Sequence, residues 1–125
     1  DSKVSKVSQK PIVRNNLVDF QRNLANKGNI VMVGRDISTV VLPNSDLKIF
    51  LQATVDIRAK RRAKEINSED INIIKKSILI RDQIDSTREF SPLKIAKESF
   101  VIHTDELDIV EVVSEIKKLY EKIND

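Results

Sequence analysis

Short apolar segments that alternate with helical patterns constrain the fold of this chain more than any other feature. Three such segments occupy residues 29–33, 47–51 and 100–103, and each is built mainly of hydrophobic residues. Runs of this length are typical of buried strands. Short apolar strands joined by helices favour a parallel sheet that is covered on both faces. The sequence therefore predicts an α/β fold.

The first helix is bounded by a proline and a glycine. Pro11 suits the first turn of a helix, and Gly28 offers a stop. We therefore expect a helix over residues 11–27. Its apolar stripe is predicted to consist of Val13, Leu17, Phe20 and Leu24.

Capping residues mark the starts of three further helices. A hydroxyl or carboxylate at such a position accepts a hydrogen bond from a free backbone N–H of the first turn. An acidic side chain three positions later can accept a hydrogen bond from the backbone N–H of the capping residue. The expected caps are Thr54, Ser68 and Asp108, the last of these paired with Glu111.

Composition excludes several classes of protein. The chain has 125 residues, enough for one domain, and it contains no Cys and a single His, His103. Disulfides, thiolate zinc sites and Cys nucleophiles are therefore excluded, and Ser–His catalysis is disfavoured. No apolar run approaches membrane-spanning length, so we expect a cytoplasmic protein without a membrane partner. A net charge of +3 is too small to indicate a general binder of nucleic acids.

A dense group of opposite charges lies in residues 81–88. If this stretch is helical, Arg81, Asp85 and Arg88 fall at i, i+4 and i+7 and face one way. Two guanidinium groups beside one carboxylate suit a ligand with phosphate and hydroxyl groups, because Arg binds phosphate bidentately and carboxylate accepts from hydroxyls. The alternative is an exposed helix with ordinary i, i+4 ion pairs.

A second charged pair follows the first predicted strand. Gly34 lets the backbone turn there, so Arg35 and Asp36 are expected at the carboxyl end of the sheet, where ligands of α/β proteins bind. In that position Arg35 could reach the same anion as Arg88. The alternative is a surface Arg–Asp pair after a turn.

The only dense basic run covers residues 58–64 and includes no aromatic residue. Single-stranded nucleic-acid platforms combine such charge with stacking rings. The run is therefore interpreted either as a solvated helix face or as a segment that faces phosphate groups.

Three separated motifs, in one order, resemble the C-terminal portion of bacterial cytidylate (CMP) kinases. They are Gly-Arg-Asp-Ile-Ser-Thr-Val-Val-Leu-Pro at 34–43, Leu-Lys-Ile-Phe-Leu at 47–51, and Arg-Asp-x-x-Asp-x-x-Arg at 81–88 followed by Pro92-Leu93. Val-Ser-Lys-Val at 4–7, with Pro11 and Arg14, extends the likeness over nearly the whole chain. The resemblance implies a P-loop nucleoside monophosphate kinase fold, with a parallel sheet flanked by helices and incomplete at the N-terminus. It also implies one kinase domain over residues 1–125, with a lid at about 55–80.

The activity that the resemblance implies is transfer of the γ-phosphoryl group of ATP to CMP or dCMP, with Mg²⁺ as the metal. Carried over by position, it places around the cytosine the residues Ser5, Arg14 and Asp36. It places at the sugar Arg81 and Asp85, and at the CMP phosphate Arg35 and Arg88. The lid over ATP receives Arg58, Arg61 and Arg62, and the residues nominated as catalytic are Arg35, Arg61 and Arg88.

The family's phosphate-binding loop is not in this sequence. G-x-x-x-x-G-K-[ST] does not occur, since the only glycines, Gly28 and Gly34, do not have the required spacing and Gly34 is followed by Arg35-Asp36 rather than by Lys and Ser or Thr. We therefore expect a part of a longer enzyme that is monomeric when complete and inactive without its N-terminal part. The resemblance implies that the Mg²⁺ ligands lie mostly outside this chain, and no metal ligand is nominated here, because Val33 replaces the acidic residue usual before Gly-Arg-Asp. A second departure from the family pattern is Ser38, which replaces a usual glycine.

Two other functions stay open at this point. The chain could be a catalytically silent module that binds a nucleoside monophosphate without transferring phosphate. It could also be a nucleic-acid-binding domain that uses residues 58–64, which would bind long polyanions with a steep salt dependence.

Overall fold

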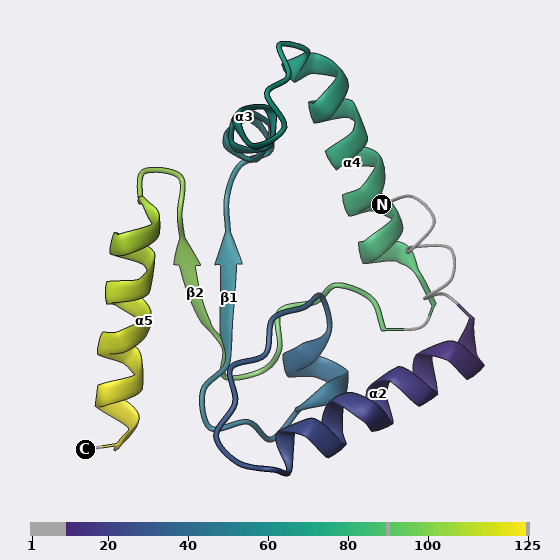
Figure 1. Ribbon diagram of the computed structural model, residues 1–125, viewed down its shortest axis with the longest axis vertical. Coiled ribbons are helices and arrows are strands. Elements are labelled where there is room, and N and C mark those ends of the chain that lie inside the picture. Colours follow the sequence, from purple (N-terminus) through teal and green to yellow (C-terminus); the bar gives the residue numbers. More distant parts are fainter. Residues whose placement is uncertain (1–9, 90, 125) are drawn as a thin grey trace. The chain divides into compact units, whose positions relative to one another are not determined.

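The computed structural model describes residues 10–89 and 91–124. The chain forms two compact units (Figure 1), which are described separately. The first unit combines Asp1–Ser45 with Asp85–Ala96, and the second combines Asp46–Ile84 with Lys97–Asp125.

The first unit is built from one long helix and a π-helical turn. Helix α2 spans Pro11–Ala25 and begins at the expected proline. The turn η1 spans Ile37–Val41, and its backbone N–H groups bond five residues back, as from Leu42 to the Ile37 carbonyl at 2.7 Å. The small core between them consists of Val18, Ile37 and Val41, with Met32, Val40 and Leu42 packed against it.

Two predictions for this unit are wrong in detail. Residues 29–33 do not form a strand, and Val31 and Val33 are 93% and 91% exposed. A strand needs a neighbour to complete its backbone hydrogen bonds, and in the described part of the chain the two strands pair only with each other. The predicted apolar stripe of α2 is also largely open to solvent, since Phe20 is 61% exposed, and the helix instead packs through Val18. The π-helical turn had no counterpart in the sequence prediction.

The second unit contains a parallel pair of strands. Strand β1 spans Ile49–Gln52 and β2 spans Phe100–His103, in a register that pairs Ile49 with Phe100 and Gln52 with His103. Both strands lie where the apolar segments predicted them, within two residues for β1. A parallel pair needs a long crossover connection, and here helices supply it, so the α/β class is confirmed.

Three helices accompany these strands along the chain. Helix α3 spans Val55–Glu65, α4 spans Ile71–Thr87 and α5 spans Ile109–Asn124. In the second unit α3 and α4 pack through Ala59, Ala63 and Ile74, with Ile78 against them. Helix α4 crosses the boundary between the units, because residues 85–87 belong to the first.

Two of the three predicted helix caps are confirmed, and the one at Ser68 is wrong. The Thr54 hydroxyl accepts from the Ile57 N–H at 3.5 Å. The Ser68 hydroxyl accepts from the Asp70 N–H at 3.3 Å, but α4 begins only at Ile71, so this bond closes a turn before the helix. Before α5, Asp108 and Glu111 exchange two hydrogen bonds of 2.8 Å each. This reciprocal pair fixes the start of α5.

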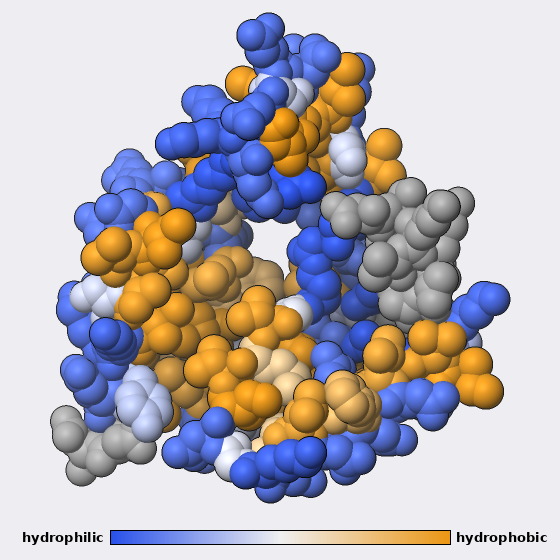
Figure 2. All heavy atoms as spheres, viewed as in Figure 1, coloured by the Kyte–Doolittle hydropathy of each residue, from blue (hydrophilic) through white to orange (hydrophobic). Residues whose placement is uncertain are grey.

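Many large hydrophobic side chains lie at the surface. Figure 2 shows hydrophobic residues in orange over much of the face in view. Exposed examples are Leu51 in β1, 52% exposed, and Ile109 in α5, 83% exposed. Exposed apolar surface of this extent marks an interaction site or an uncovered core. Across residues 10–89 and 91–124, no helix has the length and apolar character that crossing a bilayer requires.

Candidate functional site

Two buried carboxylates form the centre of a charged cluster in the first unit. Asp36 is 4% exposed and Asp85 is 3% exposed. An ionised carboxylate is rarely buried to this degree unless a cation or hydrogen-bond donors compensate for the lost hydration. Both have cationic partners, and three arginines supply them.

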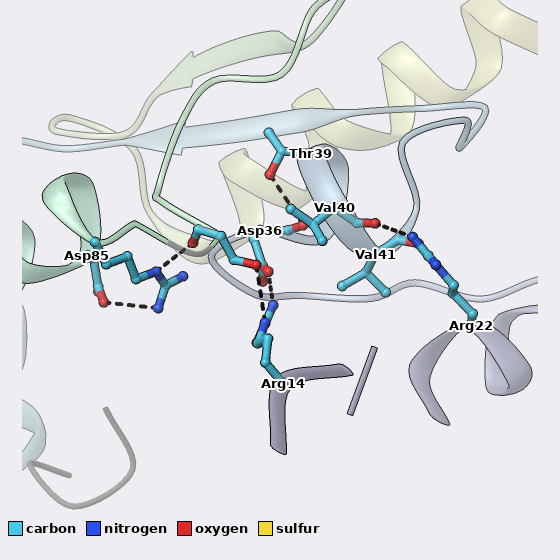
Figure 3. Close-up of polar contacts among 9 residues, drawn as sticks. Arg14, Arg22, Asp36, Thr39, Val40, Val41 and Asp85 are labelled. Carbon is cyan, nitrogen blue, oxygen red and sulfur yellow. Dashed lines mark hydrogen bonds and ion pairs between the residues drawn. The ribbon is translucent and has the colours of Figure 1, made fainter. Parts of the chain in front are cut away.

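Asp36 forms an ion pair with Arg14 of α2, drawn in Figure 3. Arg14 also donates from Nε to the Ser91 hydroxyl at 3.3 Å. Burial of the guanidinium lowers the pKa of Arg14, and the positive charge of Arg88 lowers it further. A guanidinium stays protonated in spite of such a shift, so Arg14 and Arg88 are two like charges held near each other.

Asp85 is shared by two arginines. Arg35 Nε lies 3.2 Å from one carboxylate oxygen, and Arg88 Nη1 lies 3.6 Å from the other. Arg88 also donates from Nε to the Ser91 carbonyl at 2.5 Å. Helix α4 ends at Thr87, so Arg88 follows the helix rather than continuing its stripe, and it turns back to Asp85 three residues earlier.

The cluster carries more positive than negative groups. Three guanidinium groups, on Arg14, Arg35 and Arg88, face two carboxylates, on Asp36 and Asp85. These five groups by themselves carry one net positive charge, and the Arg35 side chain is 41% exposed. A partly exposed guanidinium beside a buried carboxylate can bind an anion with its free N–H groups while it keeps its place.

The turn η1 fixes the position of Asp36. Asp36 precedes the turn, and its backbone carbonyl accepts from the N–H groups of Val40 and Val41 at 2.9 and 3.2 Å. Its side chain does not cap the turn and pairs with Arg14 instead. Gly34 lies close to this turn, and a Cβ there would lie 2.9 Å from Cγ1 of Ile37, so the Ile37 side chain would have to move.

A pocket of about 500 Å³ opens beside Arg14 in the same unit. Helix α2 forms much of its wall, and cationic, acidic, amide and hydroxyl groups all face it. Such a mixed polar lining suits a ligand that carries both donors and acceptors. The lining includes Arg14, Asn15, Asp19, Arg22, Val40 and Ser91.

The arginines predicted for the lid lie on α3 in the second unit, and all have partners. Arg58 binds both oxygens of Asp82, at 3.0 and 2.7 Å. Arg61 donates to the Thr104 hydroxyl at 3.0 Å, to the Thr104 carbonyl, and to the Leu107 carbonyl at 3.0 Å. Arg62 pairs with Glu65 at 2.8 Å. These contacts tie α3 to α4 and to the segment that follows β2.

The structure thus brings together five of the predicted site residues: Arg14, Arg35, Asp36, Asp85 and Arg88. Arg81 lies on α4 within the second unit. Ser5 lies outside the described residues.

Two residues of the cluster were missed by the sequence prediction. Ser91 contacts both Arg14 and Arg88, and its position just before Pro92 in the third motif was the available signal. Arg22 binds η1, and its signal was the eight-residue spacing from Arg14, which puts both on one face of α2.

No metal site is formed by the described residues. In that part of the chain, no three His, Cys, Asp or Glu side chains gather as ligands for an ion. Mg²⁺ prefers carboxylate oxygens together with substrate phosphates, and the two buried carboxylates here are already taken by arginines.

Comparison with known proteins agrees with the three motifs. The family model described as cytidylate kinase matches residues 1–122. Similar proteins include the cytidylate kinase of Streptococcus mutans, 50% identical over 98% of this chain and 56% of that protein. The cytidylate kinase of Fusobacterium nucleatum is 46% identical over 96% of this chain and 57% of that protein. The chain thus spans little more than half the length of these relatives. It belongs to the cytidylate kinase family.

Proposed function

We propose that this chain supplies the nucleoside monophosphate site and the lid of a kinase that transfers the γ-phosphoryl group of ATP to CMP or dCMP. The observation that carries the proposal is the convergence of three arginines on two buried carboxylates in the first unit. These residues come from three stretches of sequence, near 14, 35 and 88, and a purely structural ion pair would need only two groups.

The cluster divides into a phosphate end and a base end. Arg35 and Arg88 share Asp85, which holds their guanidinium groups in place for the phosphate of CMP. Asp85 itself, with Arg81 on the same helix, is assigned to the sugar hydroxyls. This arrangement means that the phosphate-binding groups need little reorganisation on binding.

At the base end the proposed contacts distinguish cytosine from uracil. The Asp36 carboxylate accepts from the exocyclic amine of cytosine, and Arg14 donates to its carbonyl, with Ser5 as a third contact. Uracil offers a carbonyl where cytosine offers the amine, so Asp36 would face an acceptor. Such a mismatch costs about 1–3 kcal/mol.

Phosphoryl transfer between nucleotides does not require the protein to form a covalent bond with the phosphoryl group. It depends on positioning the two phosphates and neutralising charge, so no nucleophile is assigned. We assign Arg58, Arg61 and Arg62 to the ATP side of the lid, with Arg61 as the group that stabilises charge on the transferring phosphoryl. Since Arg61 is hydrogen-bonded to Thr104 and Leu107, this role requires those bonds to exchange for ATP contacts.

We further propose that the working enzyme contains an additional N-terminal part, which carries the phosphate-binding loop. The relatives are nearly twice as long as the stretch matched here. Residues 31 and 33 are apolar and almost fully exposed, as expected of a segment that becomes a strand only when a neighbouring strand from that part pairs with it. A compact 125-residue monomer that phosphorylates CMP unaided would contradict this proposal.

The nucleic-acid alternative is disfavoured by the partners of the basic run. Three of the five cations in residues 58–64 have protein partners, since Arg58 pairs with Asp82, Arg62 pairs with Glu65, and Arg61 donates to backbone and hydroxyl oxygens. A face that binds a polyanion needs several uncompensated cations.

The test is a calorimetric titration of the full-length protein with CMP, dCMP and UMP, followed by a transfer assay with ATP. CMP is expected to bind at least tenfold more tightly than UMP, in line with one unpaired group at the base. Equal affinity for CMP and UMP contradicts the assigned base contacts. Tight CMP binding without transfer identifies the silent binding module instead.

A further inference from the structure

One face of α2 holds the turn η1 at both of its ends. Arg14, Val18 and Arg22 recur at four-residue spacing and therefore project from the same side of the helix. Arg14 pairs with Asp36 before the turn, and Val18 packs against Ile37 and Val41 within it. Arg22 reaches the far end (Figure 3), where it donates to the carbonyls of Val40 and Val41 at 2.7 and 2.9 Å.

The contact of Arg22 uses the particular shape of a guanidinium. The last carbonyls of a helical turn have no partner further along the turn, and a cation near them is also favoured by the turn's dipole. Arg22 satisfies two successive carbonyls with two N–H groups of one plane, Nε and Nη2. A lysine ammonium at this position would bring the charge but could not reproduce the planar pair of donors.

The far end of the turn is linked to Asp36 through backbone hydrogen bonds. The N–H groups of Val40 and Val41 both donate to the Asp36 carbonyl, and the Thr39 hydroxyl lies 3.4 Å from the same oxygen. The peptide groups around Val40 and Val41 are therefore held on one side by Asp36 and on the other by Arg22. If Arg22 releases its carbonyls, only Arg14 and the small apolar core remain to set the direction of the Asp36 side chain.

We propose that Arg22 is a positioning residue for base recognition: it fixes η1 against α2 so that the buried Asp36 carboxylate keeps the orientation that selects cytosine. The inference rests on the proposed function, because Arg22 would orient Asp36 for a contact with the base that the proposed function assigns to Asp36. In this role Arg22 acts on base recognition through η1, although it also lines the pocket beside Arg14.

The test compares Arg22→Gln and Arg22→Lys in the full-length protein, with kcat and KM measured for CMP and for UMP. Asn23→Ala, an exposed position on the same helix, is the matched control. For Arg22→Gln we expect the ratio of kcat/KM for CMP over UMP to fall about tenfold, mainly through a higher KM for CMP, as loss of an oriented charged hydrogen bond implies. Arg22→Lys is expected to recover thermal stability without recovering the ratio, and the control to keep both.

The outcomes separate this inference from the proposed function. A wild-type protein that prefers CMP, with variants that melt earlier but keep the full preference, shows that Arg22 is only structural and overturns the inference. A wild-type protein with no preference for CMP overturns the base assignment of Asp36, and the role of Arg22 with it. If Arg22→Gln does not fold, the ratio measured for Arg22→Lys decides.

Discussion

The two units use arginine–carboxylate pairs in opposite ways. In the first unit Asp36 and Asp85 are 4% and 3% exposed, and arginines outnumber carboxylates by three to two. In the second unit the carboxylates opposite Arg58 and Arg62 are 29% and 67% exposed, and each cation has its own partner. Surface pairs add at most about 1 kcal/mol to stability, whereas a buried pair is costly unless each group is well compensated. The buried, unbalanced set is therefore the one expected to serve a ligand.

The largest effect should follow removal of a guanidinium from the unbalanced set. Arg88→Ala and Arg35→Ala in the full-length protein are each expected to lower kcat/KM for CMP by roughly 100- to 1,000-fold, as loss of one preorganised group facing phosphate does elsewhere. Steady-state kinetics measure this. Lys118→Ala, which removes an exposed i, i+3 pair with Glu115, is the control and should change nothing. If both arginine variants keep wild-type kinetics, the ligand role of the first unit is wrong.

A smaller and more selective effect is expected at Asp36. Asp36→Asn keeps the shape of the side chain but replaces one acceptor oxygen with an N–H donor. That donor can bond the carbonyl of uracil, whereas it opposes the amine of cytosine. The preference for CMP over UMP should therefore fall roughly tenfold, or by about 1–2 kcal/mol. Competition calorimetry with the two nucleotides measures it. An unchanged preference would place base recognition elsewhere.

A substitution in the second unit should change the stability of the protein rather than its preference for CMP over UMP. Ala59 is fully buried between α3 and α4, so Ala59→Leu is expected to lower the free energy of unfolding by about 1–3 kcal/mol through overpacking. Urea unfolding of the full-length protein measures this. Lys60→Leu adds the same side chain one position along, on the exposed face, and should cost far less. A change in the CMP-to-UMP ratio with Ala59→Leu would break the distinction between the units.

The smallest effect is expected at the start of α3. Hydrogen bonds from the backbone N–H and the hydroxyl of Thr54, at 2.8 and 2.9 Å, hold the pKa of Asp105 below its usual 3.8. A carboxylate with a depressed pKa stabilises the fold above its unfolded pKa and loses that contribution as pH falls through the folded value. Asp105→Asn should therefore lower the melting temperature slightly at pH 7 and not at pH 2. Glu106→Gln, its exposed neighbour, is the control, and an Asp105→Asn deficit that persists at pH 2 would contradict the explanation.

The sequence predicted best what depends on local signals. Pro11, Thr54 and the Asp108–Glu111 pair act within one turn, and the helices they open begin where expected. The strands at 49–52 and 100–103 were predicted from their apolar residues. Both predictions are confirmed because the two segments pair with each other within this chain. The prediction of the site depended on the family resemblance. The spacing of charges in residues 81–88 was compatible both with a ligand site and with an exposed helix that forms ordinary ion pairs.

What the sequence did not predict depends on contacts between distant residues. Residues 29–33 have the composition of a strand, but composition does not supply a neighbouring strand. The π-helical turn follows from how Val18 and Arg22 bind residues 37–41, and no local propensity encodes a bond to the fifth residue back. Ser91 joins the site only because the chain folds back after α4.

The close approach at Gly34 couples two positions of the sequence. A methyl group at 34 would collide with the Ile37 side chain at 2.9–3.0 Å, and Arg35 and Asp36 lie between these two residues. Replacement at 34 alone would therefore require the Ile37 side chain to move. A laboratory selection that admits alanine at 34 should also recover a shorter residue, such as alanine, at 37, so the two sites are expected to change together.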